Sequence, residues 1–354
     1  MSRDPRLAEG DPQASLQAIT SGIDLSAAET EALFSRVMDG AVPSTMIAAL
    51  LAALSTKGET AQEIAGAARV MRARATRVPT TRESLIDTCG TGGDFSGSFN
   101  VSTAAALVVA AAGIPVAKHG NRAASSRCGS ADVLEALGVT IDLEPQLVGR
   151  SIDELGIGFL FAPRFHPAMR HAAKARREIG IRTVFNLLGP LTNPAGARRQ
   201  LIGVPSADAV TRIAGVLREL GVEAAAVVHG IEGLDEISVC GPTRIATVRM
   251  GTVEEATIDP VDLGLPTFTP AEIAGGDVIE NAGILRAVLE GQGSDAQRAV
   301  VAANAGAAIW IGDGAPTLRA GVDQALETLA SAAPARLLDD FVALTRRLAT
   351  ESRA

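Results

Sequence analysis

Aromatic side chains are scarce in this chain of 354 residues, which has no tyrosine, a single tryptophan (Trp310) and nine phenylalanines. Hydrophobic residues still make up 47% of the sequence, mainly as alanine, valine and leucine. Small apolar side chains of this kind suit helices that pack closely against a sheet. A chain of this length can form two domains or one large domain.

Cysteine and positive charge are also limited. The three cysteines, Cys89, Cys128 and Cys240, are odd in number and lack the spacing of metal ligands. This argues against a disulfide scaffold and favours a reducing compartment. The formal charge of -8 argues against nucleic acid as a partner, because proteins that bind it usually carry a basic surface.

Long apolar runs are absent as well. Glycine and proline interrupt the longest ones, such as AAALVVAAAGIPVA, before they reach the length of a membrane span. The N-terminus, MSRDPRLAEGDPQ, is polar and lacks the apolar segment of a signal peptide. We therefore expect a soluble, cytoplasmic protein with no membrane partner.

The first part of the chain has a helical pattern. Residues 1–12 are expected to form a flexible tail. Helices are then expected up to about Ala75, with Ser26 and Ser44 as N-caps of the first two and Thr60 preceding the third. The second of these helices, TMIAALLAALSTKG, is apolar on nearly all sides, which predicts burial. In a small helical domain, a second subunit can supply that cover.

From about Val78 onward, expected strands and helices alternate, and the C-terminal third returns to helices. This alternation predicts an α/β fold: a central mixed, mostly parallel sheet flanked by helices. We predict a small all-helical N-terminal domain (1–80) and a large α/β domain (81–354), with residues 165–195 packing at their interface. The expected strands are LIDTC, IPVAKH, GFLFA, AAAVVHG, LDEISVC and TRIATVR.

The stretch DTCGTGGDFSGSFNVST, Asp87 to Thr103, links an expected strand to an expected helix. Its glycines lie at the carboxyl end of the strand, where α/β sheets bind ligands. Glycine lets the backbone approach an anion closely, and free N–H groups at a helix start favour phosphate. Taken alone, a tight turn capped by Asn100 explains this stretch equally well.

A second polar loop, KHGNRAASSRCGSAD (Lys118 to Asp132), follows the next expected strand. It concentrates basic side chains among glycine and serine in a chain that is otherwise acidic. A solvated run of surface charge rarely has that composition. Two anion-binding loops at the ends of consecutive strands predict a ligand with more than one phosphate group.

Several segments together resemble one enzyme family. GTGGD, SFNVST and KHGNRAASS, with the distal GSAD, resemble the 5-phosphoribosyl-1-pyrophosphate (PRPP) site of the anthranilate phosphoribosyltransferase family of tryptophan biosynthesis. His166 to Ala195 resembles the family's substrate segment, and GLDEIS its acidic metal motif. The resemblance covers about residues 20 to 345, and the shared order of these motifs makes it specific.

The resemblance implies a reaction and an assembly. Anthranilate would attack C1 of the ribose of PRPP, and pyrophosphate would leave through a transition state like that of glycoside chemistry. An aromatic amine is largely neutral at pH 7, so no acid–base residue is expected. Catalysis would consist of positioning, by Asn121, Arg176 and Lys118, and of stabilising the leaving group. The family also implies a homodimer formed through the N-terminal helices.

The residues that the resemblance implies for PRPP lie in the two polar loops and at the start of the helix between them. Asp94 would hold the loop through hydrogen bonds. The set is Gly90, Gly93, Asp94, Ser98, Asn100, Val101, Ser102, Thr103, Lys118, His119, Gly120, Asn121, Arg122, Ala123, Ala124, Ser125, Ser126 and Ser130.

For anthranilate, the resemblance implies Gly90, Asn121, Arg176, His119 and His166. The guanidinium of Arg176 is suited to hold a carboxylate with two hydrogen bonds. Its neighbour Arg177 competes for that role, and one of the two is expected to be a surface charge. A lone histidine near a helix start is more often structural than ligand-binding.

For Mg²⁺, the resemblance implies Ser102, Asp235 and Glu236. Mg²⁺ keeps most of its waters and needs only one or two carboxylates besides phosphate oxygens. Adjacent side chains of a regular strand point to opposite faces. Both carboxylates therefore reach one site only if a strand is just starting there, which Gly233 allows.

Two other functions remain open from the sequence. A pyrimidine nucleoside phosphorylase would use phosphate on a nucleoside and would not need the acidic pair. A non-catalytic paralogue that binds nucleic acid should lose parts of the loops and gain a basic surface. The retained loops and the negative charge favour the transferase.

Overall fold

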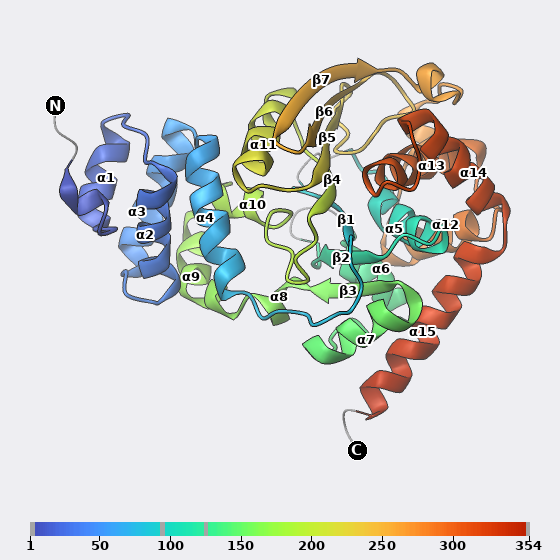
Figure 1. Cartoon of the computed structure of the whole chain (residues 1–354), viewed down its shortest axis with the longest axis horizontal. Helices are drawn as coiled ribbons and strands as arrows, with labels where there is room; N and C mark the ends of the chain where they lie inside the picture. Colours follow the sequence, from blue (N-terminus) through green and yellow to red (C-terminus); the bar gives the residue numbers. More distant parts are fainter. Residues whose placement is uncertain (1–3, 93–95, 124–126, 352–354) are drawn as a thin grey trace.

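The computed structural model describes residues 4–92, 96–123 and 127–351. Figure 1 shows a smaller helical lobe at the N-terminal end and a larger lobe built on a sheet. The small lobe contains one 3-10 turn and four helices, and later helices of the chain return to it. Its own elements are η1 (Pro5–Leu7), α1 (Pro12–Thr20), α2 (Ala27–Met38), α3 (Ser44–Lys57) and α4 (Ala61–Arg74).

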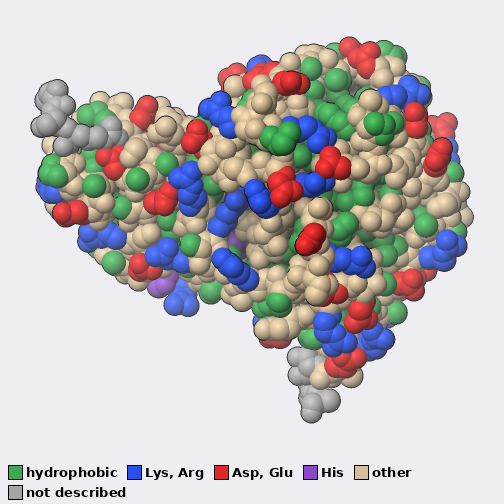
Figure 2. Space-filling model, in the orientation of Figure 1, with side chains coloured by type: hydrophobic (Ala, Val, Ile, Leu, Met, Phe, Trp, Pro, Cys, Tyr) green, Lys and Arg blue, Asp and Glu red, His purple; other side chains and the backbone are tan. Residues whose placement is uncertain are grey.

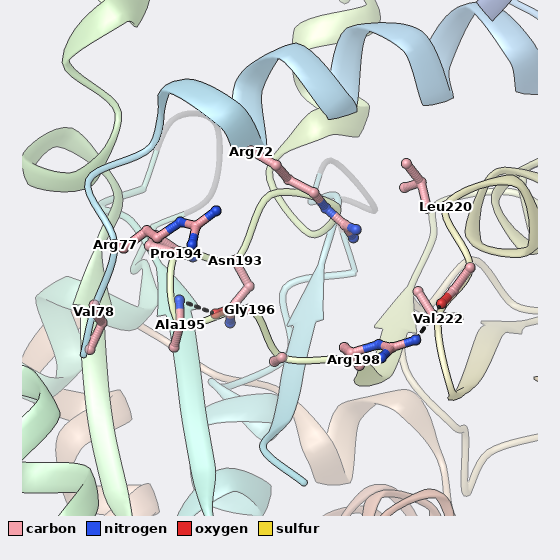
Figure 3. A pocket seen from close by; sticks show the side chains of 12 residues that line it. Arg72, Arg77, Val78, Asn193, Pro194, Ala195, Gly196, Arg198, Leu220 and Val222 are labelled. Carbon is pink, nitrogen blue, oxygen red and sulfur yellow. Dashed lines mark hydrogen bonds between the residues drawn. The ribbon is translucent and has the colours of Figure 1, made fainter. Parts of the chain in front are cut away.

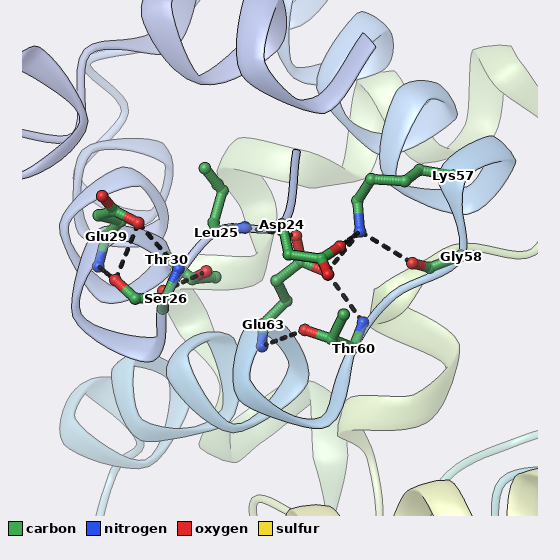
Figure 4. Close-up of polar contacts among 9 residues, drawn as sticks. All are labelled: Asp24, Leu25, Ser26, Glu29, Thr30, Lys57, Gly58, Thr60 and Glu63. Atoms are coloured by element: carbon green, nitrogen blue, oxygen red, sulfur yellow. Dashed lines mark hydrogen bonds and ion pairs between the residues drawn. The ribbon is translucent and has the colours of Figure 1, made fainter. Parts of the chain in front are cut away.

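Capping boxes fix the starts of two helices in the small lobe (Figure 4). Ser26 and Glu29 begin α2, and Thr60 and Glu63 begin α4, each pair joined by reciprocal hydrogen bonds. Ser44 is not the expected cap: it is the first residue of α3, where Pro43 occupies the cap position and makes no side-chain bond.

Glu63 does more than cap its helix. It is 1% exposed and also accepts hydrogen bonds from the Leu25 N–H and from Lys57 Nζ, each at 3.0 Å. Asp24 binds the same ammonium group at 2.6 Å. One buried carboxylate therefore joins α4, the end of α3 and the α1–α2 connection.

The first residues of the chain contribute to this lobe. The sequence predicts a flexible tail over 1–12, but residues 5–7 form a 3-10 helix capped by Asp4. Leu7 is 3% exposed and belongs to the core of the lobe. One buried leucine is enough to order a short polar segment that pattern alone assigns to a tail.

The large lobe is built on one seven-stranded sheet with the strand order β3-β2-β1-β4-β5-β6-β7. The first five strands in this order pair in parallel, and β6 and β7 add an antiparallel edge. The strands are β1 (Ile86–Gly90), β2 (Val116–Gly120), β3 (Ile157–Phe161), β4 (Arg199–Gly203), β5 (Ala224–Gly230), β6 (Thr243–Arg249) and β7 (Thr252–Ile258).

The predicted fold class is confirmed, with three differences in the strands. LDEISVC is not a strand: residues 231–242 form a connection between β5 and β6. Two strands were not expected, β4 and β7. Most of β7 is exposed and carries Glu254 and Glu255, so it lacks the apolar alternation that identifies a strand and has instead the charges typical of a sheet edge.

Helices cover both faces of the sheet. Alternate residues of β5 divide between two cores: Ala224, Ala226 and Val228 belong to one, Ala225 and Val227 to the other. The first core contains α5 (Val101–Ala111), α12 (Val278–Leu289) and α13 (Asp295–Ile311), and the second contains α11 (Ala207–Glu219) and the small lobe. The remaining long helices are α6 (Ser130–Ala136), α7 (Pro145–Leu155), α14 (Leu318–Ala330) and α15 (Ala333–Glu351).

The segment between β3 and β4 joins the two lobes. It forms α8 (Ala162–Phe165), α9 (Arg170–Ile179) and α10 (Val184–Leu188), and Figure 1 places α9 beside the helices of the small lobe. Phe185 of α10 packs on Phe34 of α2 with their ring centroids 5.8 Å apart. No helix in the described residues is both long enough and apolar enough to cross a membrane.

Candidate functional site

The first polar loop leaves the carboxyl end of β1. The Thr91 N–H donates to the Gly203 carbonyl at 3.0 Å and ties the loop to the end of β4. A Cβ on Gly90 would lie 2.8 Å from the Asp235 carboxylate. A side chain at position 90 would therefore displace the Asp235 carboxylate, which lies against the backbone there. Gly93 and Asp94 lie outside the described residues.

The second half of this loop is held by a segment that the sequence did not implicate. Ser98 forms an isolated bridge with Ala274, and the Gly275 N–H donates to the Gly97 carbonyl at 2.8 Å. Asn100 donates to the Cys128 carbonyl at 3.1 Å and accepts from Asn281 at 3.2 Å. Asn100 therefore connects the two polar loops to α12.

The start of α5 differs from the expectation of free N–H groups. Val101 and Thr103 are buried in its first turn, and the Ser102 N–H donates to Glu236 Oε1 at 3.1 Å. The positive N-terminal end of α5 therefore already stabilises the negative charge of one carboxylate, that of Glu236. Thr103 Oγ1 and, nearby in the chain, Thr91 Oγ1 are buried with no hydrogen-bond partner among the described residues.

Lys118 lies at the base of the site and is only 3% exposed. Its ammonium group donates to the Thr88 carbonyl at 2.6 Å and to Ser102 Oγ at 3.4 Å. Burial lowers the pKa of Lys118, and the nearby carboxylate of Asp87 offsets part of that effect. The ammonium group thus reaches from β2 to the start of α5.

Asp87 organises the two strands beneath the loops. It is fully buried in β1, where it accepts from the His119 N–H at 3.1 Å and from Asn193 Nδ2 at 2.8 Å. Burial raises the pKa of Asp87 to about 6, although Lys118, Asn193 and the His119 N–H favour the charged form. Asn193 also donates to the Ala117 carbonyl at 2.7 Å, so this network fixes the path of β2 into its loop.

His119 and His166 form a buried pair with ring centroids 5.1 Å apart. His119 Nδ1 contacts the Gly189 carbonyl at 3.0 Å. Its Nε2 and both ring nitrogens of His166 are buried without a partner among the described residues. Burial lowers the pKa of His119 to about 3 and that of His166 to about 4. Both rings are therefore neutral at pH 7 and present unsatisfied polar atoms, which are uncommon in a folded interior.

The second polar loop is organised by Asp132, which the sequence analysis did not select. Its carboxylate accepts from the N–H groups of Ala123 and Gly129, both at 2.9 Å. Arg122 pairs with Asp132 at 3.0 Å and with Glu135 at 2.8 Å, and these carboxylates raise its pKa. These two carboxylates therefore neutralise the charge of Arg122, and Arg122 would have to leave them in order to contact a phosphate.

The rest of this loop is open in part. Asn121 is exposed, and Ser130 begins α6 with its hydroxyl 3.4 Å from the Asn121 carbonyl. A Cβ on Gly120 would collide with the Ser130 hydroxyl and the Phe159 ring, so only glycine fits there. Ala124, Ser125 and Ser126 lie outside the described residues.

Arg176, Arg177 and Arg182 of the substrate-like segment have different environments. Arg176 is half-buried on α9, its guanidinium 5.2 Å from the centre of the Phe185 ring, and burial lowers its pKa. Arg177 is exposed. Arg182, which the sequence analysis did not select, donates to the Gly92 carbonyl at 3.0 Å. This bond and the His119–Gly189 contact join the segment to both polar loops.

The acidic residues Asp235 and Glu236 lie in the connection between β5 and β6, not on a strand. The alternation of strand side chains therefore does not separate them. Asp235 reaches Gly90, and Glu236 reaches the first turn of α5 beside Ser102. Within the described ranges, no group of three or more His, Cys, Asp or Glu side chains could hold a metal. Two carboxylates and a hydroxyl fit Mg²⁺ when phosphate and water complete its ligands.

The structure thus brings together the ends of β1 and β2, the start of α5, the acidic connection and the segment from α8 to α10. This arrangement can hold an anion next to a cation, beside two neutral histidines. Asp87, Asp132, Arg182 and Asn281 complete the network. Of these, only Asp132 carries a sequence signal, as the third residue of a helix after a glycine cap.

Both regions of the chain match family models. Residues 13–75 match the helical bundle domain of the glycosyl transferase family, and residues 82–334 match its a/b domain. Among curated proteins, the anthranilate phosphoribosyltransferase of Rubrobacter xylanophilus is 54% identical over 334 residues, covering 94% of this chain and 97% of that one. That of Desulfatibacillum aliphaticivorans is 50% identical over 331 residues, covering 94% and 98%.

Solved structures of anthranilate phosphoribosyltransferases also resemble this chain over most of its length. Anthranilate phosphoribosyltransferase from Thermus thermophilus superimposes with a TM-score of 0.88 at 45% identity, covering 94% of this chain and 99% of that one. The Saccharomyces cerevisiae enzyme in complex with PRPP and Mg gives 0.87 at 26% identity, covering 97% and 99%.

Proposed function

The chain belongs to the anthranilate phosphoribosyltransferase family, and on that premise we propose how its residues carry out the reaction. The reaction transfers the phosphoribosyl group of PRPP to the amine of anthranilate and gives N-(5-phosphoribosyl)anthranilate and pyrophosphate, a step of L-tryptophan biosynthesis. The observation that carries the proposal is the meeting of Glu236 with the start of α5 and of Asp235 with Gly90. Carboxylates beside the first polar loop support the proposal, because together with Mg²⁺ they would hold a pyrophosphate.

The bond changes need little acid–base help from the protein. The amine nitrogen of anthranilate forms a bond to C1 of the ribose, the bond from C1 to the pyrophosphate oxygen breaks, and the nitrogen loses a proton to solvent. Because both buried histidines are neutral and have pKa values of about 3 and 4, neither is suited to act as a general base at pH 7. Positioning and charge stabilisation remain as the sources of rate.

PRPP is assigned to the two polar loops. The backbone of the loop from Gly90 to Asn100, the first turn of α5 and the loop from Lys118 to Ser130 would hold its phosphates. The buried ammonium of Lys118 lies between β1 and Ser102, where it offsets the charge of the leaving pyrophosphate. Gly93, Asp94 and residues 124–126 belong to the same proposal and rest on the resemblance alone.

Mg²⁺ is assigned to Asp235, Glu236 and Ser102. A yeast relative in complex with PRPP and Mg supports this assignment. When bound, the ion would neutralise the negative charge that the pyrophosphate carries as it leaves.

Anthranilate is assigned to the space between the second loop and the α8–α10 segment. Arg176, half-buried over Phe185, would bind the carboxylate, while Asn121 and the backbone at Gly90 would lie on the side of the ribose. His119 and His166 would line the ring. A yeast relative in complex with 4-fluoroanthranilate supports a site for this class of ligand.

The remaining assignments concern the whole chain. We assign residues 1–80 and 81–354 to two domains, with 165–195 at their interface. The ranges of the two matched family models, 13–75 and 82–334, support the division into two domains. A homodimer through the small lobe and a cytoplasmic location complete the proposal. The three free cysteines are consistent with a reducing compartment.

The test is a direct assay. Purified protein is mixed with anthranilate, PRPP and Mg²⁺, and the loss of anthranilate fluorescence is followed with and without EDTA. We expect the wild type to cause a loss of anthranilate fluorescence that EDTA abolishes. The double variant Asp235→Asn with Glu236→Gln should cause little loss of fluorescence at any Mg²⁺ concentration. Undiminished turnover in that double variant would refute the metal assignment, and absence of turnover in the folded wild type would refute the function.

A further inference from the structure

A hollow lies between the lobes at the end of the sheet that is opposite to the two polar loops. It has a volume of about 460 Å³ and is bounded by the end of α4, the chain after it, the loop before β4 and the turn before β5 (Figure 3). Arg198 precedes β4, whereas Gly203 at the other end of β4 pairs with Gly90. Four steps of about 3.3 Å separate the ends of such a strand, roughly 13 Å, so this hollow is separate from the PRPP site.

The lining of the hollow is cationic. It includes Arg72, Arg77 and Arg198, and none of the lining residues is an aspartate or a glutamate. Figure 3 shows Arg72 descending from α4, Arg77 on the chain that follows it and Arg198 on the opposite wall. In the view of Figure 2, lysine and arginine side chains gather where the two lobes meet.

Two of these guanidinium groups have no carboxylate partner among the residues that the structure describes. Arg72 is half-buried and donates Nε to the Leu191 carbonyl at 2.6 Å. Neither it nor Arg77 forms an ion pair with any carboxylate in the described ranges. By contrast, Arg74 on the same helix pairs with Asp39 at 2.8 Å. Arg198 pairs with Glu223 at 3.3 Å and donates to the Gly221 carbonyl at 3.1 Å.

The cations also act on one another. Burial lowers the pKa of Arg72, and the charges of Arg198 and Arg69 lower it further. Like charges held close together in a partly buried site are unfavourable unless an anion neutralises them. Guanidinium groups are also the side chains that bind carboxylates and phosphates with paired hydrogen bonds.

We propose that this hollow binds a small anion with two or more negative charges, held by Arg72, Arg77 and Arg198. A phosphate monoester and a di- or tricarboxylate share the required chemistry, and the volume lies in the range of metabolite sites. The anion joins α4 and the chain after it to the loop before β4, and thereby ties the small lobe to the large one.

The wall of this site is connected to the substrate loops. Asn193 lines the hollow, accepts from the Ala195 N–H at 2.9 Å, and donates to Asp87 at 2.8 Å. Asp87 in turn accepts from the His119 N–H at 3.1 Å. The loop that contacts the anion is therefore hydrogen-bonded to the base of the PRPP site.

The test is calorimetric titration of the full chain with inorganic phosphate and, separately, with citrate at constant ionic strength. The combined variant Arg77→Gln and Arg198→Gln changes two exposed side chains, so it should fold. Arg74→Gln is the control: it removes an arginine at the end of α4 that pairs with Asp39 and does not line the hollow. We expect wild type and the control to bind at least one of the two anions, and the combined variant to bind it at least tenfold more weakly.

Each titration is repeated with saturating PRPP to separate the two sites. Binding that persists with PRPP and is weakened by the combined variant supports the proposal, and the anion that binds identifies the source of the negative charge. Absence of binding by both anions, binding that PRPP abolishes, or equal binding by wild type and the combined variant would overturn it.

Discussion

Four ionisable side chains are buried under the polar loops: Asp87, Lys118, His119 and His166. Asp87 and Lys118 have opposite charges and lie close enough for each to favour the charged form of the other. The histidines have no carboxylate partner in the described part of the chain and are held neutral by burial. Burying these four ionisable side chains costs free energy of folding, and buried groups with shifted pKa values are typical of functional sites.

The histidines predict how stability depends on pH. In the unfolded chain they bind protons below about pH 6.5, whereas in the folded chain His166 stays neutral until about pH 4. Their contribution to stability is therefore complete above pH 6.5 and is lost as the pH falls toward 4. Asp87 acts in the opposite direction. Because its pKa in the folded state is raised to about 6, the folded state becomes more stable as the pH falls from about 6 toward 3.8, the ordinary pKa of an aspartate.

We predict that His166→Gln weakens this acid dependence. Because Asp87 is unchanged in the variant, its effect cancels in the comparison. Between pH 7 and 5.5, the free energy of unfolding of wild type should fall by about 1 kcal/mol more than that of the variant. Urea denaturation at both pH values measures this. His171→Gln, which alters a half-buried histidine of α9, is the control, and equal falls in wild type and His166→Gln would contradict the account.

Arg176 gives a prediction for substrate binding. Replacing Arg176 with Gln removes a guanidinium from the proposed anthranilate carboxylate, and hydrogen bonds to charged groups contribute about 1.5–3 kcal/mol. The KM for anthranilate should rise roughly 10- to 100-fold, with little change in the KM for PRPP. Steady-state kinetics with each substrate varied in turn provides the measurement.

Arg177→Gln is the matched control for this prediction, because Arg177 is the exposed neighbour on the same helix. It should leave both constants near their wild-type values. If Arg176→Gln raised both KM values equally, or if Arg177→Gln had the larger effect, the assignment of the carboxylate to Arg176 would be wrong.

At the scale of elements, short polar connections hold the site together. Asp132 fixes the loop after β2 through two backbone N–H groups, and Asn100 and Asn281 join that loop to α5 and α12. The small lobe uses the same device in Glu63, which accepts from the backbone of Leu25 and Thr60 and from Lys57. These connections, rather than the helices themselves, set where loops begin.

We predict that Glu63→Ala destabilises the small lobe strongly. It removes the buried partner of Lys57, which is itself largely buried, and leaves two backbone donors without an acceptor. Lys57 keeps Asp24 as a partner, but each buried donor left without an acceptor costs about 1–3 kcal/mol. We therefore expect a loss of about 2–5 kcal/mol. Glu29→Ala removes the capping box at the start of α2 and should cost about 1 kcal/mol. Thermal unfolding of both variants tests this, and equal losses would show that the contacts of Glu63 with Lys57 and Leu25 contribute little.

Part of this arrangement could be predicted from sequence and part could not. Glycine and basic residues at the ends of β1 and β2 follow from local pattern, because parallel strands bring their carboxyl ends to one edge. The strand β4 and the acidic connection at Asp235 could not be placed by pattern, since β4 begins with the polar residues Arg199 and Gln200 and the connection has no periodicity. Asn281 and Arg182 are single polar residues whose roles arise only when distant segments meet.

The loop after β2 shows the same limit on charge. Its sequence predicts a basic patch for phosphate, and the position of the loop agrees. Yet Arg122 is neutralised by Asp132 and Glu135, which follow it by 10 and 13 residues. Local composition shows that the loop is rich in basic residues. The ion pairs of Arg122 with Asp132 and Glu135 depend instead on how α6 packs against the loop.

At the scale of the whole molecule, the two lobes meet along the α8–α10 segment. The proposed site lies at the carboxyl ends of β1, β2 and β4, and the cationic hollow lies at the opposite end of the sheet. Part of α3 does not contribute to this packing. Ala49 and Ala52 are half-buried and lie outside the core of the lobe, between the exposed Thr45 and Thr56. The spacing of these four residues puts them on one face of α3.

We predict that this face of α3 lies in a homodimer interface. Light scattering at micromolar concentration should give twice the chain mass of 36.2 kDa. Ala49→Glu buries a charge in that interface and should shift the mass to that of a monomer, whereas Ala73→Glu, at an exposed position of α4, should not. A monomeric wild type, or a dimer that both variants retain, would contradict this interface.

The central claim is that one site joins PRPP and anthranilate and releases pyrophosphate. Phosphorus NMR of a single reaction mixture tests it most directly, because it resolves PRPP, pyrophosphate and the phosphate monoester of the product. The account predicts one pyrophosphate and one new monoester for each anthranilate consumed, and none without anthranilate. If PRPP stayed intact, or if pyrophosphate formed without loss of anthranilate, the claim would be contradicted.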